Sequence, residues 1–146
     1  MKPIKIILVD DDDGDYVLFT EVLDYQTYHT TLHRVTDVDV LMNRLDDVAH
    51  ELPDIIFLEM NLPKRNGIEI LQILRSKERL KDVVIAIQST TYLKSAANLL
   101  YEHGANFYIV KPITFEELQR VIETALAIIS NEEVKYLRTE ENYLIA

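Results

Sequence analysis

The sequence predicts an α/β fold built on a doubly wound parallel sheet. Five short apolar runs rich in β-branched residues alternate with five stretches whose apolar residues recur at helical spacing. The 146 residues suit one domain with a full hydrophobic core. Strict alternation of the two element types implies parallel strands joined by right-handed crossovers, with helices on both faces of the sheet.

The five expected strands are short and mostly apolar. Continuous apolar runs are typical of parallel strands that are buried on both faces, and the second run, which alternates, is the weakest of the five. The strands are expected at Ile4–Val9, Thr30–Val35, Ile55–Leu58, Val83–Ile87 and Phe107–Val110.

A helix is expected after each strand. Gly104 can end the fourth helix in a left-handed cap. Thr114 and Glu117 form a capping-box pattern at the start of the fifth. The helices are expected over about Asp15–Leu23, Val38–Leu45, Ile68–Leu74 after Gly67, Leu93–Leu100 and Phe115–Leu126.

Composition narrows the function classes. The net charge of −10 and the pI of about 4.8 argue against direct binding to nucleic acid. The absence of cysteine excludes disulfides and thiolate chemistry. The N-terminus lacks the pattern of a signal peptide, and no apolar run approaches the roughly 20 residues that span a bilayer. We therefore expect a soluble cytoplasmic protein without membrane contact.

Polar residues follow four of the expected strands, at the sheet edge where α/β proteins place their active sites. Several carboxylates this close require a cation, and Mg²⁺ accepts such oxygen ligands. A lysine and a hydroxyl nearby suit an anion such as a phosphoryl group. The residues are Asp10, Asp11, Asp12 and Asp13 after the first strand, Glu59, Asn61 and Pro63 after the third, Ser89 and Thr90 after the fourth, and Lys111 after the fifth.

Three of the aspartates have a simpler interpretation. Asp12, Asp13 and Asp15 suit the N-terminus of the first helix, where carboxylates cap the chain and oppose the positive end of the helix dipole. We prefer that interpretation for all three. Asp10 and Asp11, at the tip of the strand, remain the candidates for metal binding.

The spacing of these residues resembles the receiver domains of response regulators, the CheY-like family. Ile7–Asp12 is similar to the first strand and acidic pair of that family, and Glu59–Gly67 to the segment that normally begins with the phosphorylated aspartate. Ser89 lies 30 residues after Glu59, and Lys111 lies 22 residues after Ser89. The resemblance covers about residues 4–129 and implies a flavodoxin-like (βα)5 fold with strand order 2-1-3-4-5.

The resemblance also implies a role for each matching residue. Asp11 would bind Mg²⁺ directly and Asp10 through water, and the Asn61 carbonyl would be a further ligand. Glu59 would stand at the phosphoacceptor position and would be a metal ligand as well. Ser89 and Lys111 would contact phosphoryl oxygens, with Thr90 at the edge of the pocket. Tyr108 would move inward when the pocket is charged, and the Lys111–Pro112 bond would be cis.

The family further implies a partner and a place in signalling. The chain would be a standalone receiver, residues 1–129, in a two-component phosphorelay with a sensor histidine kinase and a downstream protein partner. The amino-acid sequence of Asn61–Gly67 resembles the same segment of the small regulators that act with phytochrome-type kinases. The face of the fourth helix, fifth strand and fifth helix would bind partners or form a homodimer.

Glu59 departs from the family, because its carboxylate lies one methylene farther from the backbone than that of aspartate. Phosphoryl transfer tolerates little misplacement, so we expect a poor or inactive acceptor whose carboxylate reaches toward Lys111 or Ser89. Three explanations remain: natural loss of phosphorylation, an engineered mimic of the phosphorylated state, or slow phosphorylation of Glu59. Mimicry would be partial, since a carboxylate carries less charge than a phosphoryl group.

Residues 130–146 are expected to form a helical extension with a narrow apolar stripe. This tail either folds back on its own domain or contributes to a dimer or partner contact, and Val134, Leu137 and Leu144 would line the stripe.

Two other functions compete with the signalling receiver. One is an interaction module independent of phosphorylation, in which Mg²⁺ is dispensable. The other is an aspartate-nucleophile phosphatase that uses Asp10 and Asp12, a fold that also begins with a strand followed by aspartates. We expect the chain not to be an enzyme, since such phosphatases need a longer chain and a cap.

Overall fold

The computed structural model describes residues 2–131 and 143–145, and it contains a single parallel sheet. The strand order β2-β1-β3-β4-β5 confirms the predicted order, and a short sixth strand extends the sheet beside β5. All paired strands run parallel. The strands are β1 Ile4–Val9, β2 Thr30–Val35, β3 Ile55–Glu59, β4 Val84–Ser89, β5 Phe107–Val110 and β6 Leu144–Ile145.

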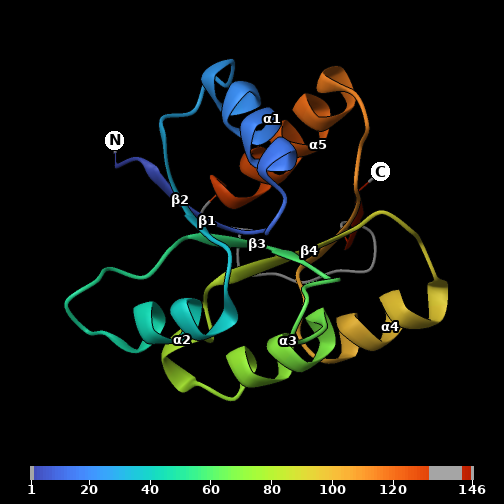
Figure 1. The fold of residues 1–146 in the computed structure, drawn as a ribbon. Coiled ribbons are helices and arrows are strands. Elements are labelled where there is room, and N and C mark those ends of the chain that lie inside the picture. The colour runs from blue at the N-terminus through green and yellow to red at the C-terminus, as the bar shows by residue number, and fades with distance from the viewer. Residues whose placement is uncertain (1, 132–142, 146) are drawn as a thin grey trace.

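Helices cover both faces of the sheet, as predicted. In Figure 1, α1 and α5 lie together on one face, and α2, α3 and α4 lie on the other. A short 3₁₀ helix, η1, precedes β4. The bounds are α1 Asp13–Asp24, α2 Val38–Asp46, α3 Gly67–Arg75, η1 Glu78–Leu80, α4 Lys94–Glu102 and α5 Phe115–Ile129.

The helix ends follow from local side chains. Helix α1 begins two residues before the predicted start because the Asp12 side chain accepts a hydrogen bond from the Asp15 amide at 2.9 Å. Thr114 caps α5 as predicted, accepting from the Glu117 amide at 3.2 Å. Gly104 has a φ of 105°, the left-handed conformation expected after α4.

The sheet separates two hydrophobic clusters. Successive strand residues point to opposite faces, so each buried strand contributes to both clusters. One cluster joins the sheet to α2, α3 and α4 and includes Tyr108, whereas the other joins it to α1 and α5 and includes Phe57. Among the described helices, none is long and apolar enough to cross a membrane.

The end of the chain returns to the sheet. Residues 132–142, where most of the predicted helical extension falls, lie outside the described residues. Leu144 and Ile145 form a strand rather than a helix, with Leu144 opposite Tyr108 and Ile145 opposite Ile109 in β5. Tyr143 and Ile145 are buried. These last residues therefore fold back on their own domain, which was one of the two alternatives.

Candidate functional site

The carboxyl edge of the sheet gathers charged side chains from β1, β3 and β5. Asp10 directly follows β1, Glu59 is the last residue of β3, and Lys111 directly follows β5. Strand β1 lies between β2 and β3, so the chain order reverses at this point of the sheet. The topology thus brings together three of the residues that the sequence singled out.

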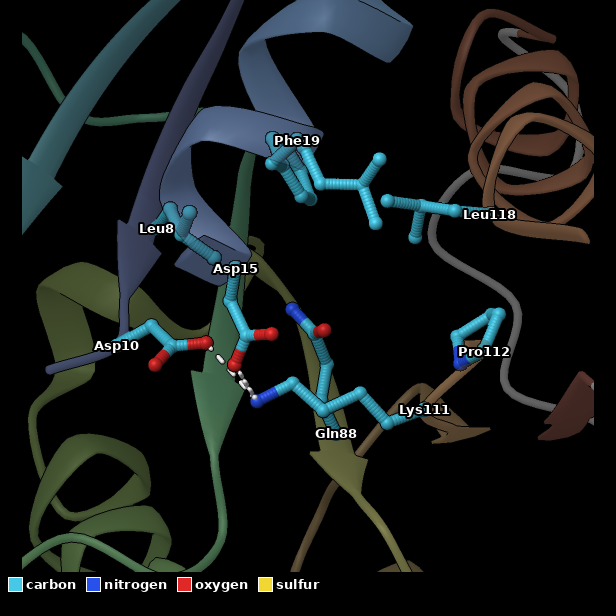
Figure 2. Close-up of a pocket in the computed structure, with 9 residues that line it drawn as sticks. Leu8, Asp10, Asp15, Phe19, Gln88, Lys111, Pro112 and Leu118 are labelled. Carbon is cyan, nitrogen blue, oxygen red and sulfur yellow. Dashed lines mark hydrogen bonds and ion pairs between the residues drawn. The ribbon is translucent and has the colours of Figure 1, made fainter. Parts of the chain in front are cut away.

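Lys111 lies at the centre of the site. Its Nζ atom is 3.0 Å from Oδ2 of Asp10, 2.5 Å from Oδ2 of Asp15 and 2.5 Å from Oε2 of Glu59. Figure 2 shows the ammonium between Asp10 and Asp15. An ammonium group has three N–H donors, and here each of them has a carboxylate partner.

Burial strengthens the electrostatic interactions between these charged side chains. The side chains of Asp10, Glu59 and Lys111 are 3%, 8% and 13% exposed, whereas that of Asp15 is 37% exposed. Burial lowers the pKa of Lys111, but hydrogen bonds to Asp15 and Glu59 outweigh it, so the net pKa is raised. Burial raises the pKa of Asp10 against the opposing effects of the Asp12 amide and Lys111. Lys111 is therefore charged at neutral pH.

Asp15 lies in the first turn of α1, as the preferred sequence interpretation expected, but its carboxylate also binds Lys111 and so belongs to the site. Asp12 is the cap, through its contact with the Asp15 amide. Asp13 instead pairs with Arg34 at 2.8 Å. The side chain of Asp15 points from the first turn of α1 to Lys111 because that turn lies directly over the end of β1 (Figure 2).

Gln88 is a further residue of the site that the sequence did not indicate. It lies in β4, is 3% exposed and lines a cavity of about 10 Å³ together with Asp10, Asp15 and Lys111 (Figure 2). Its Nε2 atom finds no hydrogen-bond partner within the described part of the chain. The sequence feature that could have indicated Gln88 is a polar residue near the end of an otherwise apolar strand.

The predicted metal ligands are only partly gathered. Asp10 and Glu59 face one another across Lys111, but Asp11 is exposed and is not among the carboxylates that bind the lysine. The backbone N–H of Asn61 lies 3.4 Å from Oε1 of Glu59. Among residues 2–131 and 143–145, no group of three or more His, Cys, Asp or Glu side chains is arranged to hold a metal ion. The ligand types suit Mg²⁺, but the ammonium of Lys111 takes the central position.

Among the described residues, no hydrogen bond joins the side chain of Ser89 or Thr90 to Glu59 or Lys111. The Ser89 hydroxyl accepts a hydrogen bond from the Thr91 amide at 3.3 Å. Thr90 is exposed at the rim. Only the main chain of Ser89 joins the site, because its carbonyl accepts from the Lys111 amide at 2.7 Å.

Tyr108 has an inward side chain. It is 1% exposed, and its hydroxyl donates to the Thr91 carbonyl at 2.6 Å. Tyr92 packs edge-on against its ring, with 5.8 Å between the ring centroids. Tyr108 of β5 is thus tied to the loop between β4 and α4.

The expected cis bond before Pro112 is not found. Among the described residues every peptide bond is trans, including Lys111–Pro112. The expectation came from the resemblance alone, and the trans isomer is intrinsically favoured even before proline. Pro112 still lines the small cavity beside Lys111.

Comparison with known proteins agrees with this fold. Residues 6–123 match the response regulator receiver domain. The response regulator ArlR of Staphylococcus aureus is 32% identical over 122 residues, which are 84% of this chain and 52% of ArlR. The chain therefore spans about half the length of that relative.

Two solved structures are similar over nearly the whole chain. The phosphorylated cyanobacterial phytochrome response regulator RcpA has a TM-score of 0.79 and 27% identity, covering 89% of this chain and 96% of RcpA. The Mn²⁺-bound response regulator Rcp1 has a TM-score of 0.74 and 25% identity, covering 92% and 97% of the two chains. With the family match over residues 6–123, these likenesses establish that the chain belongs to the response regulator receiver domain family of two-component systems.

Proposed function

We propose that this chain is a receiver module of a phosphorelay that signals by protein contact, with its pocket held in a charge-paired state by Glu59. The observation that carries the proposal is the 2.5 Å contact between Oε2 of Glu59 and Nζ of Lys111 in a buried site. A phosphoryl group at this position would present oxygens to the same lysine. The carboxylate of Glu59 therefore supplies part of the negative charge of a phosphoryl group without being phosphorylated.

Glu59 is poorly placed to accept a phosphoryl group. Its Oε2 atom is bound by Lys111, and its Oε1 atom lies 3.4 Å from the Asn61 amide. A nucleophile must be aligned with phosphorus, and a misplacement of about 1 Å can cost roughly 100-fold in rate. Both the longer side chain and these contacts keep the carboxylate from attacking phosphorus in the required alignment.

The inward position of Tyr108 supports a signalling state. The family resemblance implies that this aromatic side chain moves inward when the pocket is charged. Here the ring is buried and its hydroxyl is bound to Thr91, while Glu59 and Lys111 are paired. The mimicry is partial, because Ser89 does not contact the carboxylate and one carboxylate offers fewer acceptor oxygens.

The proposal includes Mg²⁺ binding, on the condition that the ion can compete with the ammonium of Lys111. Asp10, Asp11, Glu59 and the Asn61 carbonyl offer the oxygen atoms that Mg²⁺ prefers. Lys111 already neutralises Asp10 and Glu59, so a metal ion would have to compete with the ammonium. We expect Mg²⁺ to bind weakly to this chain.

The partners follow from the family and its relatives. RcpA, named as a phytochrome response regulator, is similar over 89% of this chain, which supports a phytochrome-type histidine kinase as the upstream partner. The face formed by α4, β5 and α5 is the proposed contact for a downstream protein or a second copy. Such a partner would be met in the cytoplasm.

The test compares the chain with its Glu59→Asp variant. Both are incubated with Mg²⁺ and a small phosphodonor such as acetyl phosphate, and intact mass reports the adduct. We expect a phosphoryl adduct on the aspartate variant only, because the shorter side chain returns the carboxylate to the acceptor position. Equal adducts on both proteins would refute the proposed role of Glu59, and no adduct on either would refute the receiver chemistry.

A second function is an interaction module that never uses phosphorylation or Mg²⁺. The observation that favours it is the full engagement of the Lys111 ammonium by Asp10, Asp15 and Glu59. Titration with Mg²⁺, followed by tyrosine fluorescence, separates the two functions. Saturable binding supports the receiver, whereas an unchanged signal together with an unmodified Glu59→Asp variant supports the interaction module.

A further inference from the structure

The last described residues, Tyr143–Ile145, are anchored on both sides of the sheet edge, and we call them the terminal strap. Tyr143 is 7% exposed, and its hydroxyl donates to the Ala97 carbonyl of α4 at 2.6 Å. Leu144 and Ile145 pair with β5. The strap thus bridges α4 and the edge of the sheet.

Each hydrophobic cluster receives one residue of the strap. Tyr143 belongs to the cluster that contains Tyr108 and α4, whereas Ile145 belongs to the cluster that contains Ile109 and α5. Leu144, between them, is 44% exposed. Without the strap, the apolar strand β5 would present an open edge, which proteins normally cover or protect.

The strap contacts the aromatic residue that the pocket positions. The ring centroids of Tyr108 and Tyr143 lie 6.3 Å apart, and those of Tyr101 and Tyr143 lie 4.9 Å apart. Such tilted and edge-on contacts between aromatic rings are favourable. An outward movement of Tyr108 would therefore disturb the site in which the ring of Tyr143 packs, which we call its seat.

A continuous set of contacts joins this seat to the pocket. Glu59 binds Lys111, whose amide binds the carbonyl of Ser89 at 2.7 Å. The Ser89 hydroxyl is bound by the Thr91 amide at 3.3 Å, and the Thr91 carbonyl accepts the hydroxyl of Tyr108 at 2.6 Å. Each step from Glu59 to Tyr108 is a hydrogen bond or an ion pair between described residues, and the last step, from Tyr108 to Tyr143, is the contact between their rings.

We propose that the terminal strap is an intramolecular latch, which docks beside β5 when Tyr108 is inward and is released when the pocket loses its charge pair. The latch rests on the proposed function, because it requires that Glu59 keeps the pocket charged. Since coupling between two sites is reciprocal, docking of the strap also stabilises the inward Tyr108.

The first experiment asks whether the strap closes the β5 edge in the full chain. Amide hydrogen exchange is measured at residues 107–110 and 143–145. Ile145→Asp should speed exchange at both segments by about tenfold, because a buried anchor becomes charged. Leu144→Asp is the matched control, since the same charge enters at the exposed position and should leave the rates within about twofold.

Tyr143→Phe provides a milder variant that keeps the ring and removes only the hydrogen bond to Ala97. It should speed exchange at residues 143–145 by about threefold, while exchange in β1 stays unchanged and reports an intact domain. Unchanged exchange at residues 107–110 and 143–145 in Tyr143→Phe and Ile145→Asp would overturn the strap.

The second experiment tests coupling to the pocket. In Glu59→Ala the charge pair with Lys111 is lost, and exchange at residues 143–145 should rise by about fivefold over the parent chain, again with β1 unchanged. Equal rates at the strap in Glu59→Ala and the parent would overturn the latch. The proposed function would survive that result, because it is judged separately by the phosphoryl adduct on Glu59→Asp.

Discussion

Oε2 of Glu59 lies 2.5 Å from Nζ of Lys111 at the carboxyl edge of the sheet, where Glu59 is buried and the side chain of Lys111 is 13% exposed. Asp10 and Asp15 contact the same ammonium, so one positive charge serves three carboxylates. The lysine is therefore the main neutralising charge of the pocket. The consequences of this arrangement can be measured in stability, pH response and metal binding.

Lys111→Met should be strongly destabilising, whereas Glu59→Gln should not. Removing the ammonium leaves Asp10 and Glu59 buried without their cation, and breaking buried charge pairs in this way costs about 3 kcal/mol or more. Glu59→Gln leaves the lysine with Asp10 and Asp15, so we expect a loss of about 1 kcal/mol or less. Urea unfolding at pH 7 measures both. Equal losses in the two variants would contradict the central role of Lys111.

The pH dependence of stability should reveal Lys111 on the alkaline side. Its pKa is raised above the ordinary 10.5 because the hydrogen bonds to Asp15 and Glu59 outweigh burial. A group whose folded pKa exceeds its unfolded value stabilises the fold fully below the unfolded pKa and loses that effect as pH rises through the folded pKa.

We therefore expect the stability difference between the chain and Lys111→Met to be constant up to about pH 10 and to shrink above it. The other titratable groups are common to both proteins, so their contributions cancel in the difference. Urea unfolding at several pH values between 7 and 11.5 provides the comparison. A difference that grows with pH would show that the sign of the shift is wrong.

Periodicity in the sequence predicted most of the fold. Strands β1, β2 and β5 have the predicted bounds, because continuous or alternating apolar runs leave little choice for a buried parallel strand. Strand β6 was missed, since two residues carry no period and their pairing with β5 depends on where the chain returns. The position of a two-residue strand is a tertiary property.

The position of the candidate site and the contact of Glu59 with Lys111 were predicted, but the contact of Asp15 with Lys111 was not. Asp10, Glu59 and Lys111 meet because they end neighbouring parallel strands, a property of topology. Asp15 has equally good local reasons to be a helix cap, and only the three-dimensional proximity of α1 to β5 selects Lys111 as its partner. The Lys111–Pro112 bond has the trans isomer that X–Pro bonds favour by themselves, and only the resemblance had implied cis.

Tyr108→Phe should weaken the link between β5 and the β4–α4 loop while preserving the packing of the ring. The variant loses the hydrogen bond to the Thr91 carbonyl, and such a bond contributes about 1 kcal/mol. The freed carbonyl lies on an exposed residue and can bind water, so we expect no larger loss. Urea unfolding measures the cost, and a loss well above about 2 kcal/mol would indicate a role beyond this single bond.

Lys111→Met should also bind Mg²⁺ more tightly than the parent chain. Under the proposed function, Mg²⁺ would have to compete with the ammonium in the parent, because Lys111 binds both Asp10 and Glu59. In the variant these carboxylates, with Asp15 and the nearby Asp11, repel one another and gain from a divalent cation. We expect an affinity at least about tenfold higher, and a corresponding rise in stability when Mg²⁺ is added. Calorimetric titration measures the first effect and urea unfolding with and without Mg²⁺ the second. If the parent binds Mg²⁺ as tightly as Lys111→Met, the ammonium does not occupy the position of the cation, and the charge-paired pocket described here would be incorrect.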